Sequence, residues 1–396
     1  MPLLSVVVPT HNRSDYAISC IESTLHFADP DLQLVVADTS SDRRLYDRLH
    51  DGTCSFLRDP RFVYRKIDEP SNLTKNHNDA VALADGKYVC VIGDDDCITG
   101  AALEAARWAD EQNLPLVSQT LSANYAWPDF RSRFVGMGHA ARLYVPKTLR
   151  AGQWRASGAD LQNALSRALQ GTENLPRCYH GIVRRDLLET IRQQTGAYFH
   201  GSSPDMSGAV SLACLVDRYF EVDTPLSIPG ASGGSNSGRS AMNTHKGDLS
   251  SDTQTSSFKD SGWTAGVPRF FAVETVWAHA GLETLGKLRP DLLPDFDYAR
   301  LIALCMMRHP EYRSVSEAAA DEVLTYFGQN IAAATKRKLT AETWARRLYL
   351  LRRLSMPTAA NGRRYFGGVS SIAEASHRYE DYARAQGIAF TGISDQ

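Results

Sequence analysis

Apolar and polar positions alternate in blocks over residues 1–120. Short apolar runs of strand length are each followed by a polar turn and then by a segment with apolar residues at helical spacing. The apolar runs are residues 4–8, 32–37, 62–67 and 88–92. Strands that alternate with helices in this way predict an α/β fold, with a mostly parallel sheet covered by helices on both faces.

Polar side chains gather where these predicted strands end. Residues 9–13 follow the first strand, Asp38 follows the second, and residues 94–96, all aspartate, follow the fourth. Parallel strands bring their carboxyl ends to one edge of the sheet, where ligands bind in folds of this type. We therefore expect the functional site at this edge.

The three consecutive aspartates, Asp94 to Asp96, are the most informative feature of the chain. Adjacent carboxylates raise one another's pKa unless a hard cation or hydrogen-bond donors neutralise them. The pattern indicates a site for Mn²⁺ or Mg²⁺, because these cations take carboxylate oxygens together with the diphosphate oxygens of a nucleotide. The alternative is a solvated acidic turn that caps the helix beginning near Gly100.

Composition narrows the class of protein. The chain has 396 residues, of which 43% are hydrophobic and 22% charged, and its net charge is −2. This balance provides no basic stripe, so we expect no nucleic-acid partner. Seven cysteines without a Cys-x-x-Cys pair indicate a reducing compartment, and no apolar run approaches the roughly 18 residues of a spanning helix. With no signal-sequence pattern at its start, we expect a cytoplasmic protein.

Three motifs together carry a resemblance to a known family. They are residues 5–13 (SVVVPTHNR), 35–41 (VVADTSS) and 93–96 (GDDD). On these residues, the N-terminal part of the chain resembles a family 2 glycosyltransferase with the GT-A fold. Such an enzyme transfers a sugar from a nucleotide diphosphate sugar to an acceptor hydroxyl, with Mn²⁺ or Mg²⁺ as cofactor.

The resemblance also implies roles for individual residues. The nucleotide pocket would be lined by Pro9, Thr10, Asn12 and Arg13. Asp38 would form a hydrogen bond to the base, usually uracil, although a helix N-cap also explains this residue. For Arg13 the alternative is a surface cation.

For the three aspartates, the resemblance implies different roles. Asp94 and Asp95 would contact the ribose or the diphosphate, while Asp96 would ligate the metal together with Asp94.

The segment between the third and fourth strands is rich in amides. A helix that begins there, with Lys75 in its first turn, suits an anionic diphosphate. Lys75 and Asn78 are therefore candidate donor contacts. A simple capped start of a helix explains the same pattern.

A second candidate for chemistry lies where Ser203, Pro204 and Asp205 open an apolar helix. Transfer with inversion needs one carboxylate to take the proton from the attacking hydroxyl. The segment resembles the one that carries this base in many family 2 enzymes, which makes Asp205 the candidate catalytic base, although the commoner Glu-Asp pair is missing. The alternative is a residue that only caps the helix.

Residues 229–239 are dense in glycine and serine, which predicts a mobile loop that could close over the cleft. His245 follows this loop. In GT-A enzymes a histidine after the catalytic helix often completes the metal site, so we predict His245 as a third metal ligand beside Asp94 and Asp96. A surface histidine is the alternative.

From residue 267 the pattern becomes helical. Residues 336–354 carry seven basic residues against one acid, Glu342, with Trp344, Leu348, Leu351 and Leu354 interleaved. A basic amphipathic helix of this kind can lie on the anionic inner face of the cytoplasmic membrane. The alternative is a helix that packs on the protein or on a second subunit of a homo-oligomer.

These observations predict a GT-A domain over residues 1–265, with a nucleotide-binding half (1–120) and an acceptor-binding half (121–265), followed by a helical region (266–396). We expect an inverting, metal-dependent glycosyltransferase that moves a sugar from a nucleotide diphosphate sugar, with a UDP sugar as the first expectation, to a hydroxyl of a saccharide or lipid-linked saccharide in cell-surface polysaccharide assembly. The alternatives are an inactive nucleotide-sugar-binding scaffold, a nucleotidyltransferase and a metal-dependent hydrolase.

Overall fold

A computed structural model describes the chain except residues 70, 355–358, 361, 391 and 393–396. Its centre is an eight-stranded sheet with the order β3-β2-β1-β4-β10-β6-β11-β9. The first four strands in the chain are β1 (Leu4–Thr10), β2 (Leu32–Asp38), β3 (Phe62–Lys66) and β4 (Tyr88–Val91). They pair in parallel, so their carboxyl ends meet at one edge. The predicted α/β class is confirmed.

The other half of the sheet is mixed. Strand β10 (Ile182–Arg184) lies antiparallel between β4 and β6 (Leu116–Gln119). Strand β11 (Arg218–Val222) runs parallel to β6, and β9 (Gln153–Ala156) closes the edge in antiparallel pairing. Because β10 runs antiparallel to β4, the loop before β10 lies at the carboxyl end of β4, where Tyr179 pairs with Val91.

Helices cover both faces of this sheet, because the strands carry apolar side chains on both faces. Alternate residues of a strand point to opposite faces, and in β1 Val6 and Val8 belong to one core while Val7 belongs to another. The first core includes side chains of α1 (Ser14–Leu25), α2 (Arg44–His50) and α4 (Gly100–Glu111). The second includes side chains of α3 (Leu73–Val81), α6 (Arg185–Thr195) and α7 (Pro204–Leu215).

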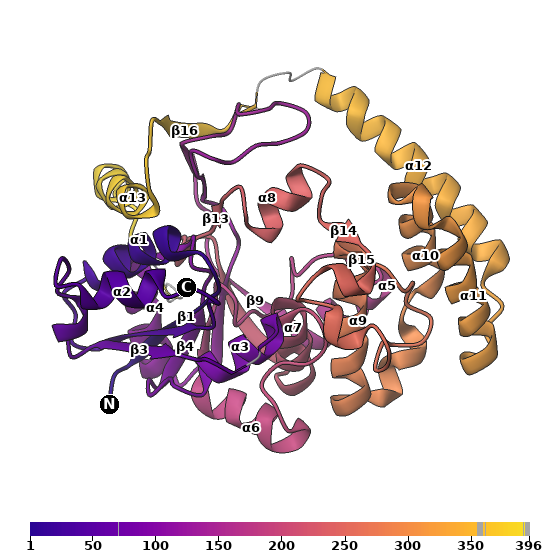
Figure 1. Ribbon diagram of the computed structural model, residues 1–396, viewed down its shortest axis with the longest axis horizontal. Coiled ribbons are helices and arrows are strands. Elements are labelled where there is room, and N and C mark those ends of the chain that lie inside the picture. The colour runs from indigo at the N-terminus through magenta and orange to yellow at the C-terminus, as the bar shows by residue number, and fades with distance from the viewer. Residues whose placement is uncertain (70, 355–358, 361, 391, 393–396) are drawn as a thin grey trace.

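A third core holds the helical part of the molecule, which Figure 1 shows on the side away from β3. It contains α5 (Ser157–Ser166), α9 (Val273–Leu288), α10 (Tyr298–Arg308), α11 (Arg313–Phe327) and α12 (Ala332–Leu354). Helix α7 is buried over residues 204–213 except at Asp205, and it contributes to this core and to the sheet core. The third core therefore extends across the predicted boundary at residue 266.

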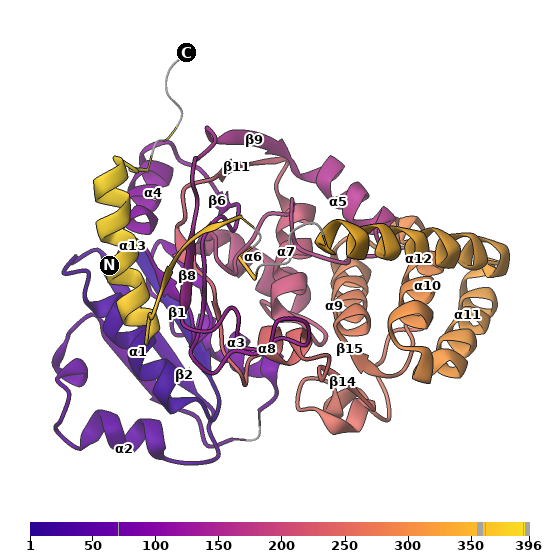
Figure 2. The same cartoon turned by 90° about the horizontal axis from the view of Figure 1, so that it is seen from above.

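The end of the chain also differs from the predicted division, because it leaves the helical part and returns to the nucleotide-binding half. Strand β16 (Arg364–Gly367) pairs with β8 (Arg142–Val145), and α13 (Ile372–Gln386) packs on α1 (Figures 1 and 2). Glu380 of α13 accepts a hydrogen bond from the Gly100 N–H at the start of α4, at 2.9 Å. The sequence placed this segment in a helical region but did not indicate its distant partner.

The chain also forms several short elements. They are β5 (Cys97–Ile98), β7 (Asn124–Ala126), β12 (Ser227–Ile228), β13 (Gly230–Ala231), α8 (Asn236–Ala241), β14 (Lys246–Gly247) and β15 (Phe271–Ala272). Strand β13 pairs with β7, which anchors the beginning of the Gly/Ser-rich loop. Among the described helices, none is both long and apolar enough to cross a membrane.

Tyr379 tests how far α13 stabilises the N-terminal half. Its side chain is 2% exposed, and its hydroxyl has no hydrogen-bond partner among the described residues. We expect Tyr379→Ala to lower the free energy of unfolding by about 3 kcal/mol, through lost packing and a cavity. Tyr379→Phe should leave it unchanged or raise it by about 1 kcal/mol, because it removes an unpaired buried group. Denaturant unfolding measures both, and an unchanged Ala variant would contradict the packing role.

Candidate active site

A two-lobed cleft opens at the carboxyl ends of β1 and β4. One cavity of about 280 Å³, the acidic lobe, is lined by residues 93–96 and by Pro9, Thr10 and Arg13. A second cavity of about 400 Å³, the Asp205 lobe, is lined by Asp205 and side chains from α8 and α9. The two lobes are contiguous, because they share Leu73, His77, Tyr179, Asn236 and Ser237.

Arg13 bridges two of the three aspartates in the acidic lobe. Its Nε donates to Asp94 Oδ1 at 2.7 Å, and its Nη2 lies 2.8 Å from Asp95 Oδ2. Thr10 Oγ1 also donates to Asp94, at 2.6 Å. Burial nevertheless raises the pKa of Asp94 to about 6, against the opposing charge of Arg13.

Asp96 is held by the backbone instead. Its two carboxylate oxygens accept the N–H groups of Gly93 and Gly230, each at 2.6 Å. The loop can approach this closely only at a glycine, because a Cβ on Gly230 would lie 1.8 Å from the Asp95 carbonyl oxygen. Burial and the neighbouring Asp95 carboxylate raise the pKa of Asp96 well above its usual range.

The donor set of this lobe fits a divalent cation that is shared with a ligand. Three buried carboxylates face one guanidinium, so negative charge remains in excess, and hard oxygen ligands suit Mg²⁺ or Mn²⁺. Among the described residues, no group of three His, Cys, Asp or Glu side chains is arranged to hold a metal ion by itself. Asp94 and Asp96 would therefore hold a cation that takes its other ligands from water and diphosphate oxygens.

Two of the predicted nucleotide contacts do not line the cleft. Asn12 turns to the second strand's loop, where its side-chain oxygen accepts the Ser41 N–H at 2.9 Å. Asp38 is fully buried, and its carboxylate accepts the Ser40 N–H and the Tyr64 hydroxyl, each at 2.8 Å. Asp38 is not a helix cap either, because α2 begins only at Arg44.

Lys75 and Asn78 also face away from the acidic lobe, in a separate pocket beside Tyr198. Helical phase explains this placement, because α3 presents Leu73 and His77, four residues apart, to the cleft. Lys75 pairs with Asp79 at 2.7 Å. The Asn78 side chain bonds to the backbone of Tyr198 and Phe199 and so ties α3 to the segment before α7.

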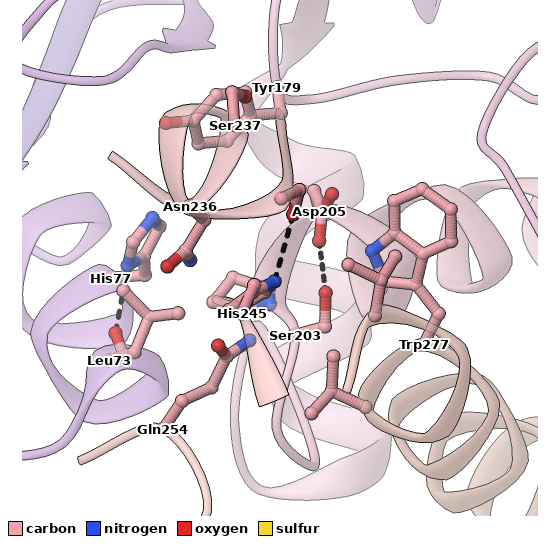
Figure 3. Close-up of a pocket in the computed structure, with 14 residues that line it drawn as sticks. Leu73, His77, Tyr179, Ser203, Asp205, Asn236, Ser237, His245, Gln254 and Trp277 are labelled. Carbon is pink, nitrogen blue, oxygen red and sulfur yellow. Dashed lines mark hydrogen bonds between the residues drawn. The ribbon is translucent and has the colours of Figure 1, made fainter. Parts of the chain in front are cut away.

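Asp205 stands in the first turn of α7 and is half-buried. Its Oδ1 accepts a hydrogen bond from Ser203 Oγ. Figure 3 shows its carboxylate in the second lobe between Trp277 and the α8 segment. The same lobe contains Gln254, whose buried Oε1 has no hydrogen-bond partner among the described residues.

His245 lies in the Asp205 lobe rather than beside the acidic cluster. It is 7% exposed, and its Nδ1 lies 3.1 Å from Ser240 Oγ. Burial lowers the pKa of His245 to about 4, so the imidazole is neutral at pH 7. Its role as a metal ligand stays a prediction, since in this structure it is not among the residues around Asp96.

Two residues that line the acidic lobe were missed by the sequence analysis. His180 Nε2 lies 3.5 Å from Asp96 Oδ2, and burial lowers the pKa of His180 to about 3. The Tyr179 hydroxyl lies against Gly93, where a Cβ would come within 2.9 Å of it. Both residues precede the antiparallel strand β10, and no periodic pattern in the sequence indicates where that strand inserts.

Asn78 separates a structural role from a role in nucleotide binding. We expect Asn78→Ala to lower the free energy of unfolding by about 2 kcal/mol, because buried backbone groups of Tyr198 and Phe199 lose their partner. Nucleotide affinity, measured by calorimetry on the folded protein, should be unchanged. Lys75→Ala is the control and should match the parent in both measurements. A weakened nucleotide affinity in Asn78→Ala would restore its predicted role as a donor contact.

Comparison with known proteins identifies the N-terminal part. Residues 5–133 match the family model described as Glycosyl transferase family 2. The WcaA protein of Escherichia coli K12, named as a glycosyl transferase of colanic acid biosynthesis, is 34% identical over 95 residues, which are 24% of this chain and 33% of WcaA. A chondroitin synthase of Escherichia coli is 26% identical over 140 residues, 32% of this chain and 20% of that protein.

The chain thus spans a third or less of the length of these two relatives. A crystal structure of S. aureus TarS 1-349 in complex with UDP-GlcNAc is 14% identical, with a TM-score of 0.45, over 97% of this chain and 92% of that one. The family match covers all three motifs of the resemblance, at residues 5–13, 35–41 and 93–96. Residues 5–133 are therefore similar to glycosyltransferase family 2, and this match covers less than half of the chain.

Proposed function

We propose that the protein is an inverting, metal-dependent glycosyltransferase that moves a sugar from a nucleotide diphosphate sugar, a UDP sugar in the first instance, to a saccharide hydroxyl. The family of residues 5–133 supports transfer of a sugar. The names of two relatives, which refer to colanic acid and chondroitin, support a polysaccharide pathway.

One observation carries this proposal. Five residues line both lobes of the cleft, so a molecule bound at the acidic cluster and one bound at Asp205 would meet along shared walls. A transferase needs this arrangement, because the leaving diphosphate and the attacking hydroxyl lie on opposite sides of the anomeric carbon. The acidic lobe would hold the diphosphate, and the Asp205 lobe would hold the acceptor.

In this mechanism, Asp205 takes the proton from the acceptor hydroxyl while the hydroxyl oxygen attacks the anomeric carbon. The bond from that carbon to the phosphate oxygen breaks, and the nucleotide diphosphate leaves with the electron pair. Ser203 donates to Asp205 Oδ1, which leaves Oδ2 to act as the base. The guanidinium of Arg13 would stabilise the negative charge on the leaving diphosphate. When bound, Mn²⁺ or Mg²⁺ would neutralise the developing charge.

Nucleotide titrations test the donor half of the proposal. We expect one of UDP, GDP, CMP or dTDP, with UDP first, to bind in the presence of Mn²⁺ and to bind at least tenfold more weakly in EDTA. Asp96→Ala should lose the metal-dependent part, because it removes a carboxylate of the cation site. Asp186→Asn, an exposed change in the first turn of α6, is the control. If the folded protein binds none of the four nucleotides, the donor assignment is wrong.

Asp205→Asn tests the catalytic half. The amide keeps the size and the hydrogen bond to Ser203 but cannot accept the proton, so kcat should fall by a factor of about 10² to 10⁴. The affinity for the nucleotide should stay at the parent value, which calorimetry on the same preparation verifies. Proton NMR of the product should show an inverted anomeric configuration. Parent-like turnover in Asp205→Asn would exclude this residue as the base, and release of free sugar alone would indicate a hydrolase.

A further inference from the structure

We propose that a third cavity, between the start of α9 and the inner face of α12, binds the sugar units of an acceptor chain that lie behind the reacting unit. This proposal rests on the proposed function and extends its acceptor side. The cavity, hereafter the α12 cavity, measures about 700 Å³. This volume lies within the roughly 300–1,000 Å³ that is usual for ligand sites.

The α12 cavity continues the Asp205 lobe. Four residues line both of them: Ser240, His245, Val273 and Trp277. A chain whose terminal hydroxyl lies at Asp205 would therefore enter the α12 cavity with its next units. Together with the acidic lobe, the three cavities form one path from the ends of β1 and β4 to α12.

Helix α12 has two faces with different surroundings, because residues three and four apart share a side of a helix. The inner face carries Thr335, Lys338, Glu342, Ala345, Arg346 and Tyr349. Its first half packs on α10, where Lys338 pairs with Asp297 at 2.6 Å and Glu342 pairs with Arg300 at 2.8 Å. Its second half, Ala345, Arg346 and Tyr349, extends beyond this contact and lines the α12 cavity.

The opposite face of α12 points away from the cavity. It carries Trp344, Arg347, Leu348 and Leu351, of which the three apolar side chains are 58%, 58% and 63% exposed. Arg347 lies over the Trp344 ring, 5.1 Å from its centroid. The neighbours Arg346 and Arg347 therefore offer a matched pair, because only the first lines the cavity.

The chemistry of the walls favours a saccharide. Rings from three separate segments, Trp277, Tyr349 and Phe134, line the cavity, although Tyr349 is 65% and Phe134 is 80% exposed. Aromatic rings of this kind can cover the apolar C–H faces of sugar rings, while polar groups between them bind hydroxyls. A chain that crosses the cavity would reduce the exposure of both aromatic side chains.

The floor of the cavity supplies polar groups in fixed positions. Glu274 is buried between Arg308, at 2.6 Å, and His309, at 2.8 Å, so its carboxylate is fully engaged. His309 is 5% exposed and uses only Nε2 in this contact, and its Nδ1 has no hydrogen-bond partner among the described residues. The same holds for Nε2 of His245. Buried polar atoms normally have partners, and the hydroxyls of a sugar can supply them.

An array of defined oligosaccharides of one to six sugar units tests the proposal. We expect the parent to bind its preferred series more tightly with each added unit, up to about three units, because the α12 cavity fills in turn. Arg346→Ala and Tyr349→Ala should each lose about tenfold in affinity for the longer members and so flatten this length dependence. Ala345→Trp, which fills the cavity, should flatten it further. Arg347→Ala and Leu348→Trp, on the opposite face, should keep the parent's length dependence.

Three results would overturn the proposal: an unchanged length dependence in the Arg346, Tyr349 and Ala345 variants, an equal loss in the Arg347 and Leu348 variants, or binding that does not depend on length in the parent. UDP titration of every variant keeps this failure separate from failure of the proposed function. A parent that binds nucleotide but ignores chain length refutes only the α12 cavity, whereas a folded parent without nucleotide binding refutes the function itself.

Discussion

Three carboxylates buried at the end of β4 are the constraint on which the rest of the site depends. Charges of one sign are held together out of water only where donors surround them. Arg13 comes from the end of β1, while Gly230 and Ser232 come from a loop more than a hundred residues further along the chain. The acidic cluster therefore fixes both the path of that loop and the conformation of the turn after β1.

The same constraint leaves the cluster incompletely neutralised. Burial raises the pKa of Asp94, and burial together with the Asp95 carboxylate raises the pKa of Asp96, although one arginine and four N–H or O–H donors surround the three carboxylates. A cation that entered this site would lower its free energy, because it would offset part of the repulsion between the carboxylates. Relief of the repulsion among these three carboxylates would thus contribute to the binding free energy of a metal and nucleotide, in addition to the new contacts.

The sequence predicted those parts of the site that local pattern determines. The first four strands follow from alternating blocks, and the meeting of Thr10, Arg13 and Asp94 follows from the parallel order of β1 and β4. Residues whose position depends on helical phase were less predictable. One step along α3 separates His77, in the cleft, from Asn78, outside it. The amide-rich composition of this segment does not show which side of α3 faces the cleft, because packing of the helix on the sheet decides which side is buried.

Contacts that depend on segments after the first four strands were not predictable from the sequence. The insertion of β10 beside β4, which brings Tyr179 and His180 to the acidic cluster, has no periodic signal of its own. The return of α13 to α1 is equally hidden, because an amphipathic helix shows that it has a partner but not which one. The predicted helical region, residues 266–396, includes α13, but the sequence did not indicate that this helix packs on α1.

Helix α12 has two faces with different surroundings, which its sequence pattern does not separate. The sequence indicates a single helix with interleaved basic and apolar residues. Trp344, Leu348 and Leu351 suggested a membrane or subunit contact, which stays a prediction. The side chain of Leu354 lies outside the described residues. In the structure these three residues form the outer face, and the cavity-lining residues stand between them in the sequence. Substitutions one residue apart therefore report on opposite sides of the helix. An effect that alternates with the helical period assigns a function to one face, whereas an effect spread over both faces indicates only that the helix must be present.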